Sequence, residues 1–135
     1  MRQNPRMASR WKKASPALLA GGLATMGALH FVAPKPFARI IPKALPNPDA
    51  LVAISGVAEL ACAALVALPK TRRVGALASA ALFVGVYPAN VQMAVDASRT
   101  SDARYQAIAY SRLPLQAPLV LWALRIAKSA SPGRR

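Results

Sequence analysis

The sequence predicts an all-helical integral membrane protein, a bundle of four transmembrane helices with both termini in the cytoplasm. Hydrophobic residues make up 55% of the 135 residues and charged residues only 16%, against about 25% charged in a soluble protein. The hydrophobic residues come in long blocks, whereas the helices of soluble proteins mix them with polar residues. Prolines and basic residues separate the blocks, so we expect several membrane crossings within one domain.

The chain divides into three parts. Residues 1–14 form a basic cytoplasmic tail, residues 15–128 a domain of four transmembrane helices, and residues 129–135 a basic C-terminal tail. The four predicted crossings cover about residues 16–33, 49–68, 74–95 and 107–127. A helix of about 20 residues at about 1.5 Å each has the length needed to cross the hydrocarbon core of a bilayer.

The first crossing follows a tail rich in Arg and Lys, an arrangement that secretory signals share. We interpret it as an uncleaved crossing, because further apolar blocks follow and no A-x-A cleavage site stands after the run. Pro16 suits the first turn of its helix. Small residues recur on one face at helical spacing, which predicts the close approach of a neighbouring helix there. These residues are Ala17, Gly21, Ala24 and Ala28.

The second crossing carries an acid, Glu59, near its middle. Residues 33–48, which precede this crossing, contain prolines that rule out a continuous helix. We expect this segment to lie on the membrane surface or to fold over the end of the bundle. Asn47, Pro48 and Asp49 predict the start of the crossing. A central acid opposes insertion by about 3 kcal/mol, nearly cancelling the contribution of the large aliphatic residues. Glu59 should therefore face the interior of a bundle.

The third crossing follows a short, strongly basic turn at residues 69–73 that predicts a tight helical hairpin. Pro88 lies within this crossing and should kink it, because proline removes a backbone hydrogen bond. Thr100 or Ser101 is expected to cap the last helix. Twelve of the 18 Lys and Arg residues lie in the two tails and the second connection, and six lie in the first and third connections. This asymmetry predicts that both termini are cytoplasmic.

Six polar residues are candidates for one site in the outer half of the bundle. They are His30, Glu59, Tyr87, Asn90, Arg112 and Gln116. We expect Arg112 to be the first charge partner of Glu59 and His30 the second, since an Arg partner would keep a buried acid ionised. His30 and Arg112 could instead mark the membrane surface. Asn90 and Gln116 could instead form hydrogen bonds between helices.

Composition excludes several classes of function. A single cysteine, Cys62, excludes an intramolecular disulfide and a Cys-based metal cluster, and a single histidine excludes a multi-His metal site. The net charge of +14 lies in the tails and between apolar blocks, with no basic face interleaved with aromatic residues, which favours lipid headgroups over nucleic acid as the partner. We find no nucleotide-binding loop, haem ligand pair or nucleophile triad, so we expect no catalysis by the isolated chain.

An ordered series of short motifs resembles the small DoxX-like membrane proteins. The series is His30-Phe31-x-x-Pro34-x-x-Phe37, Leu45-Pro46-x-Pro48, Ser55-Gly56-x-x-Glu59, Pro69-x-Thr71-Arg72, Pro88-Ala89-Asn90-x-x-Met93-Ala94 and Arg112-Leu113-Pro114-x-Gln116. The resemblance covers residues 16–127 and implies a compact four-helix membrane bundle. The wider group includes subunits linked to quinone-dependent sulfur oxidation and membrane partners of thiol or oxidative-stress enzymes.

We therefore expect a multi-pass protein of the cytoplasmic membrane that serves as the membrane subunit or anchor of a quinone- or thiol-linked redox system. A quinone is the candidate ligand and an oxidoreductase the candidate partner. One alternative is a small proton-coupled transporter that uses Glu59 and works as a homo-oligomer. Another is a structural membrane subunit whose polar residues only specify packing. The alternatives differ in whether substituting Glu59 changes partner binding, transport or only stability.

Overall fold

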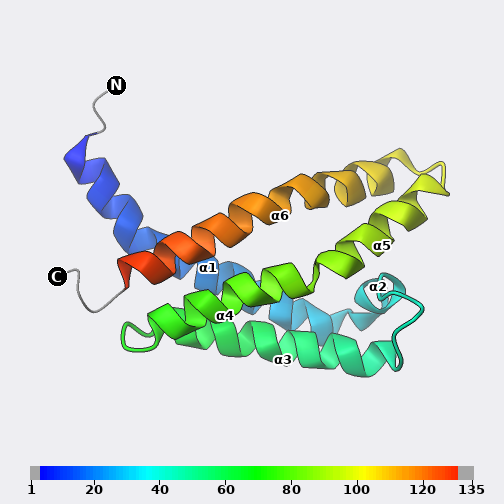
Figure 1. Cartoon of the computed structure of the whole chain (residues 1–135), viewed down its shortest axis with the longest axis horizontal. Coiled ribbons are helices and arrows are strands. Elements are labelled where there is room, and N and C mark those ends of the chain that lie inside the picture. Colours follow the sequence, from blue (N-terminus) through cyan, green and yellow to red (C-terminus); the bar gives the residue numbers. More distant parts are fainter. Residues whose placement is uncertain (1–3, 131–135) are drawn as a thin grey trace.

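The computed structural model describes residues 4–130, and these residues are helical with no β-strand among them. Six helices follow one another along the chain (Figure 1). They are α1 (Pro5–Val32), α2 (Pro34–Arg39), α3 (Pro48–Ala67), α4 (Arg72–Gly85), α5 (Tyr87–Ser98) and α6 (Ala103–Ser129).

The long helices run along one common axis, and neighbours pack in a row rather than in a fully closed ring. α1 packs on α3, α3 on α4, and α6 on both α4 and α5 (Figure 1). The short α2 folds back over the end of the α1–α3 pair. α1 meets α6 mainly at the end of the molecule where α1 begins and α6 ends, and there Trp122 Nε1 donates a hydrogen bond to Ser15 Oγ at 2.6 Å.

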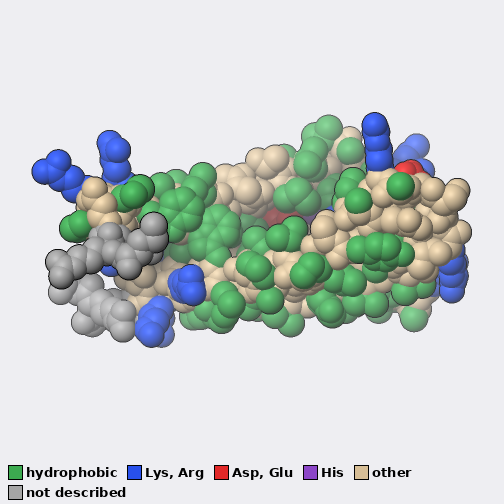
Figure 2. Space-filling view, turned by 90° about the horizontal axis from the view of Figure 1, so that it is seen from above, with side chains coloured by type: hydrophobic (Ala, Val, Ile, Leu, Met, Phe, Trp, Pro, Cys, Tyr) green, Lys and Arg blue, Asp and Glu red, His purple; other side chains and the backbone are tan. Residues whose placement is uncertain are grey.

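The buried core of the α1, α3, α4 and α6 packing is made largely of small side chains. Its larger members come from α1, α3 and α6: Leu19, Leu23, Val66 and Ile126. By contrast, 22 large hydrophobic side chains are exposed. In Figure 2 the Lys and Arg side chains gather toward the two ends of the long axis, and hydrophobic side chains cover much of the belt between them. An apolar belt between two charged ends is the surface that a bilayer requires.

Three stretches are long and apolar enough to cross a membrane: α1, α3 and the composite of α4 and α5, Arg72–Ser98. They correspond to the first three predicted crossings. The fourth predicted crossing, residues 107–127, lies within α6, which is long enough but less apolar because of residues such as Arg112 and Gln116. A transmembrane position for α6 therefore stays a prediction.

The first helix begins earlier than the sequence suggested. α1 starts at Pro5, with the Asn4 side chain accepting a hydrogen bond from the Arg6 amide at 3.1 Å, so most of the predicted basic tail is helical. Pro16 lies inside this helix instead of at its start. The predicted small-residue face is also wrong. Ala17, Gly21 and Ala28 are exposed and Ala24 is half-buried, whereas the buried face of α1 carries Leu19, Leu23 and Gly27.

The third crossing is interrupted as Pro88 predicts. α4 ends at Gly85 and α5 begins at Tyr87, because the proline nitrogen cannot donate the hydrogen bond that would continue the helix. The turn between α3 and α4 is as tight as expected, and Arg72 closes it. The Arg72 guanidinium donates from Nε to the Val66 carbonyl at 2.8 Å and from Nη2 to the Ala67 carbonyl at 3.1 Å, which satisfies the C-terminus of α3.

The predicted N-terminus of α3 is confirmed, whereas the predicted N-cap of α6 is wrong. Asn47 is the N-cap of α3 and Pro48 its first residue, as predicted, although the Asn47 side chain makes no capping hydrogen bond. The last helix is capped by Asp102 rather than by Thr100 or Ser101. The Asp102 carboxylate accepts hydrogen bonds from the Arg104 and Tyr105 amides, a geometry that favours an acid at an N-cap.

We predict that the Ser15–Trp122 hydrogen bond is what couples α1 to α6. Ser15→Ala and Trp122→Phe should each lower the free energy of unfolding by about 1 kcal/mol, and the double variant should lose little more than either alone. Thermal unfolding in detergent measures this. Trp11→Phe is the matched control, because Trp11 is exposed and makes no hydrogen bond within residues 4–130, and it should change stability by less than about 0.5 kcal/mol. Strictly additive losses would contradict the coupling.

Candidate functional site

The centre of the candidate site is a pair of titratable side chains from α1 and α3. His30 Nδ1 lies 3.2 Å from Glu59 Oε2, and the two side chains are only 9% and 12% exposed. The helices approach closely at this point, because Gly56, one turn before Glu59, leaves room for the His30 side chain. A bulkier residue at Gly56 would push the histidine away from the acid.

The orientation of the His30 ring is fixed from two sides. Its Nδ1 lies 2.7 Å from the Met26 carbonyl oxygen, which can only accept, so Nδ1 carries a hydrogen. That hydrogen points at the carbonyl, and Glu59 Oε2 is left without a hydrogen bond in the part of the chain that the structure describes. The Phe37 ring of α2 stacks on the imidazole at a centroid distance of 3.9 Å. The contact between His30 and Glu59 is therefore an electrostatic pairing, and the other ring nitrogen remains for a second partner.

A second polar pair joins α5 to α6. Asn90 Nδ2 donates a hydrogen bond to Gln116 Oε1 at 3.2 Å, and Asn90 is buried. Gln116 Nε2 is buried as well and has no hydrogen-bond partner within residues 4–130. One hydrogen bond between two amides leaves a further donor unpaired whichever way the groups are turned. An unpaired donor in an apolar surrounding is costly, so this nitrogen is a candidate ligand-binding atom.

Arg112 of α6 acts on the first of these pairs through its charge. It lies one helical turn before Gln116, and its Nη1 contacts Met93 Sδ of α5 at 3.8 Å. Arg112 acts on the Glu59 carboxyl group only through its charge, whereas His30 Nδ1 lies within 3.2 Å of Glu59 Oε2. The structure thus reverses the expected order of partners, with His30 first and Arg112 second.

Five of the six candidates from the sequence belong to this arrangement. Tyr87 does not, because it is exposed at the start of α5 and makes no hydrogen bond, ion pair or ring contact within residues 4–130. Figure 2 shows an acidic and a histidine side chain together in a hollow midway along the molecule, open to the surface. Sequence reasoning missed the roles of Met26, Phe37 and Met93. Phe37 follows His30 by seven residues through a proline-containing segment, and no periodicity links residues across such a turn.

The chemistry available here is proton exchange and hydrogen bonding. A carboxyl group beside an imidazole can take up and release protons, and an unpaired amide nitrogen can donate to a carbonyl oxygen of a ligand. No group of three or more His, Cys, Asp or Glu residues that could hold a metal ion occurs within residues 4–130. These groups could therefore exchange a proton with a polar headgroup or form a hydrogen bond to it.

A protein-family model described as "Domain of unknown function (DUF8561)" matches residues 19–127, which is most of the chain, so the protein belongs to this family. No curated protein and no solved structure matches the chain. The matched residues include all six candidate residues.

Proposed function

We propose that this member of the DUF8561 family is a four-span protein of the cytoplasmic membrane, similar to DoxX-like proteins, that serves as the membrane subunit of a quinone- or thiol-linked redox system. The observation that carries the proposal is the buried Glu59–His30 pair in a hollow of the apolar belt. An acid within a membrane-spanning segment is costly to insert, and such residues usually serve a ligand or proton pathway.

The packing of α6 supports the fourth span. α6 lies antiparallel against both α4 and α5 along their length, so if the α4–α5 stretch crosses the bilayer, α6 occupies the same depth (Figure 1). Four spans put both termini on one side. The end with the α3–α4 turn carries basic residues and none of the four acids of the sequence, which favours its position in the cytoplasm.

A quinone suits the chemistry of the site. Its apolar tail would lie in lipid beside the exposed aliphatic side chains, and its two carbonyl oxygens would need hydrogen-bond donors. Gln116 Nε2 is a buried donor without a partner in residues 4–130, whereas the second ring nitrogen of His30 can donate only when the imidazole is protonated. Glu59 would exchange the protons that accompany reduction of a quinone.

Binding of a short-chain ubiquinone analogue to the purified protein tests the ligand. Gln116→Leu removes the unpaired donor and should weaken binding about tenfold, measured by equilibrium dialysis in detergent. Gln92→Leu is the matched control, because Gln92 is a half-buried amide of α5 that donates to Asp96 within its own helix at 2.9 Å. Equal affinity of wild type and Gln116→Leu would exclude a quinone at this amide.

The main alternative is proton-coupled transport. It is favoured by one observation: Glu59 Oε2 is buried beside His30 without a hydrogen bond within the described residues, so this oxygen could bind a proton or a cationic substrate. A transporter would work without an oxidoreductase partner, as an oligomer of this chain. A proton-dependent flux in protein-only vesicles, abolished by Glu59→Gln, would favour this function over the redox subunit.

A further inference from the structure

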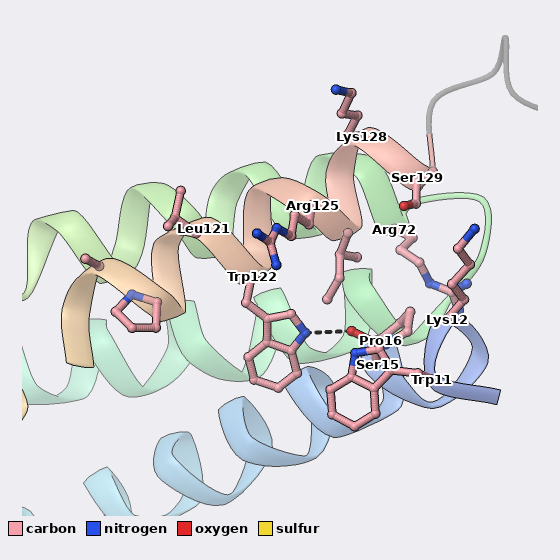
Figure 3. Close-up of a pocket in the computed structure, with 14 residues that line it drawn as sticks. Trp11, Lys12, Ser15, Pro16, Arg72, Leu121, Trp122, Arg125, Lys128 and Ser129 are labelled. Atoms are coloured by element: carbon pink, nitrogen blue, oxygen red, sulfur yellow. Dashed lines mark hydrogen bonds between the residues drawn. The ribbon is translucent and has the colours of Figure 1, made fainter. Parts of the chain in front are cut away.

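A second site lies at the opposite end of the molecule from α2, where α1 begins and α6 ends. An open cleft of about 1120 Å³ separates the first turns of α1 from the last turns of α6. Both tryptophans of the protein, Trp11 and Trp122, line it, and Trp122 is held by its hydrogen bond to Ser15 (Figure 3). None of the candidate residues of the Glu59–His30 site lines this cleft.

The cleft wall is strongly basic at one end. Four cations line it and no acid does: Lys12, Arg72, Arg125 and Lys128. Arg125 and Lys128 are exposed and have no ion-pair or hydrogen-bond partner within residues 4–130. Like charges repel one another, so this group needs counter-charge, and the four acids of the sequence all lie in the middle or at the other end of the molecule.

The remaining wall is apolar. Ala117, Pro118 and Leu121 extend the cleft along α6 toward the belt of hydrophobic side chains. In Figure 3, Leu121 lies on this side, Arg125 extends over Trp122, and Lys12 and Arg72 lie toward the end of the bundle. The order along the cleft is thus apolar, aromatic and basic, which matches the order of acyl chain, interface and phosphate in one leaflet of a bilayer.

We propose that this cleft binds an anionic phospholipid of the leaflet that faces the basic end. The four cations of the wall hold the headgroup, with Arg125 over Trp122, the two tryptophans lie at the level of the glycerol backbone, and an acyl chain lies along Leu121 and Pro118. Basic pockets between transmembrane helices are a general form of anionic headgroup site. The proposal does not depend on the redox function, since it concerns different residues at a different depth.

The two tryptophans make the test direct, because all of the tryptophan fluorescence comes from the cleft. The full chain is placed in phosphatidylcholine bilayers containing brominated phosphatidylglycerol or, in parallel, brominated phosphatidylcholine at the same mole fraction. We expect the anionic lipid to quench the fluorescence with an apparent affinity at least about fivefold higher than that of the zwitterionic lipid. This is the gain in affinity that one Lys or Arg near an anionic surface contributes. Arg125→Gln should remove most of this preference.

Lys70→Gln is the matched control. Lys70 lies in the α3–α4 turn at the same end of the molecule but does not line the cleft, so its loss should leave the preference unchanged. Equal quenching by the two lipids, or equal loss in the Arg125 and Lys70 variants, would overturn the proposal in favour of general surface attraction. If inorganic phosphate displaces the lipid, the cleft binds a free anion instead. If native mass spectrometry shows a dimer without lipid, a second copy of the chain occupies the cleft instead.

Discussion

Replacing His30 by leucine is expected to destabilise the protein by about 3 kcal/mol, whereas replacing Glu59 by leucine is expected to leave stability unchanged or to raise it. Removing the histidine leaves a buried acid without its 3.2 Å partner, and breaking a buried pair from one side costs about 3–5 kcal/mol. Removing the acid instead relieves its cost of insertion, about 3 kcal/mol, and leaves the imidazole bonded to the Met26 carbonyl.

The double variant decides whether the pairing is the cause. His30→Leu combined with Glu59→Leu should recover most of the stability lost in His30→Leu alone, because no uncompensated acid remains. Unfolding in detergent or by titration with a denaturing detergent measures all four proteins. If His30→Leu lowers stability by the same amount with Glu59 present and with Glu59 replaced, the side chains act independently and the pair is not coupled.

The second large effect is expected at Gly75 in α4. A Cβ atom at this position would lie 2.6 Å from the Val66 amide nitrogen and 2.6 Å from the Leu65 Cβ, so it would meet the backbone of α3. A backbone cannot rotate away as a side chain can, so Gly75→Ala should separate α3 from α4 and lower the free energy of unfolding by about 3 kcal/mol. Loss of the folded fraction on size-exclusion chromatography measures the effect.

Gly22→Ala is the matched control for this substitution. Gly22 is also helical, and a Cβ atom there meets nothing within 4 Å. Alanine favours a helix over glycine by about 1 kcal/mol, so the control should be neutral or slightly stabilising. A Gly75→Ala protein as stable as the Gly22→Ala protein would show that α3 and α4 pack less closely than the structure describes.

Helix positions could be predicted from the sequence because length, hydropathy and proline are local signals. The break before Pro88 and the start of α3 at Asn47 and Pro48 follow from the missing proline donor and its fixed backbone angle. The buried face of α1 could not be predicted in the same way. The helix is apolar on nearly all sides, so periodicity did not distinguish Ala17 and Gly21, which are exposed, from Leu23 and Gly27, which pack on α3.

The sequence indicated which polar residues are candidates for the site better than it indicated which of them contact one another. His30, Glu59, Asn90 and Gln116 could be selected because polar groups in an apolar stretch need partners. Which of them meet depends on the relative register of helices, and that is set by tertiary packing. The close approach at Gly56 brings His30 to Glu59, while Arg112 contacts Met93 of α5. Tyr87 was included for its position in the sequence, yet the break at Val86 leaves it on the surface.

The central proposal is that the Glu59–His30 site serves a redox assembly, and co-purification from native membranes tests it most directly. The tagged wild-type protein and the Glu59→Gln protein are extracted in mild detergent, and their partners are identified by mass spectrometry. We predict that an oxidoreductase accompanies the wild type and that Glu59→Gln, although equally well folded, retains much less of it. If the wild type is recovered alone or only with further copies of itself, the redox-subunit function is wrong.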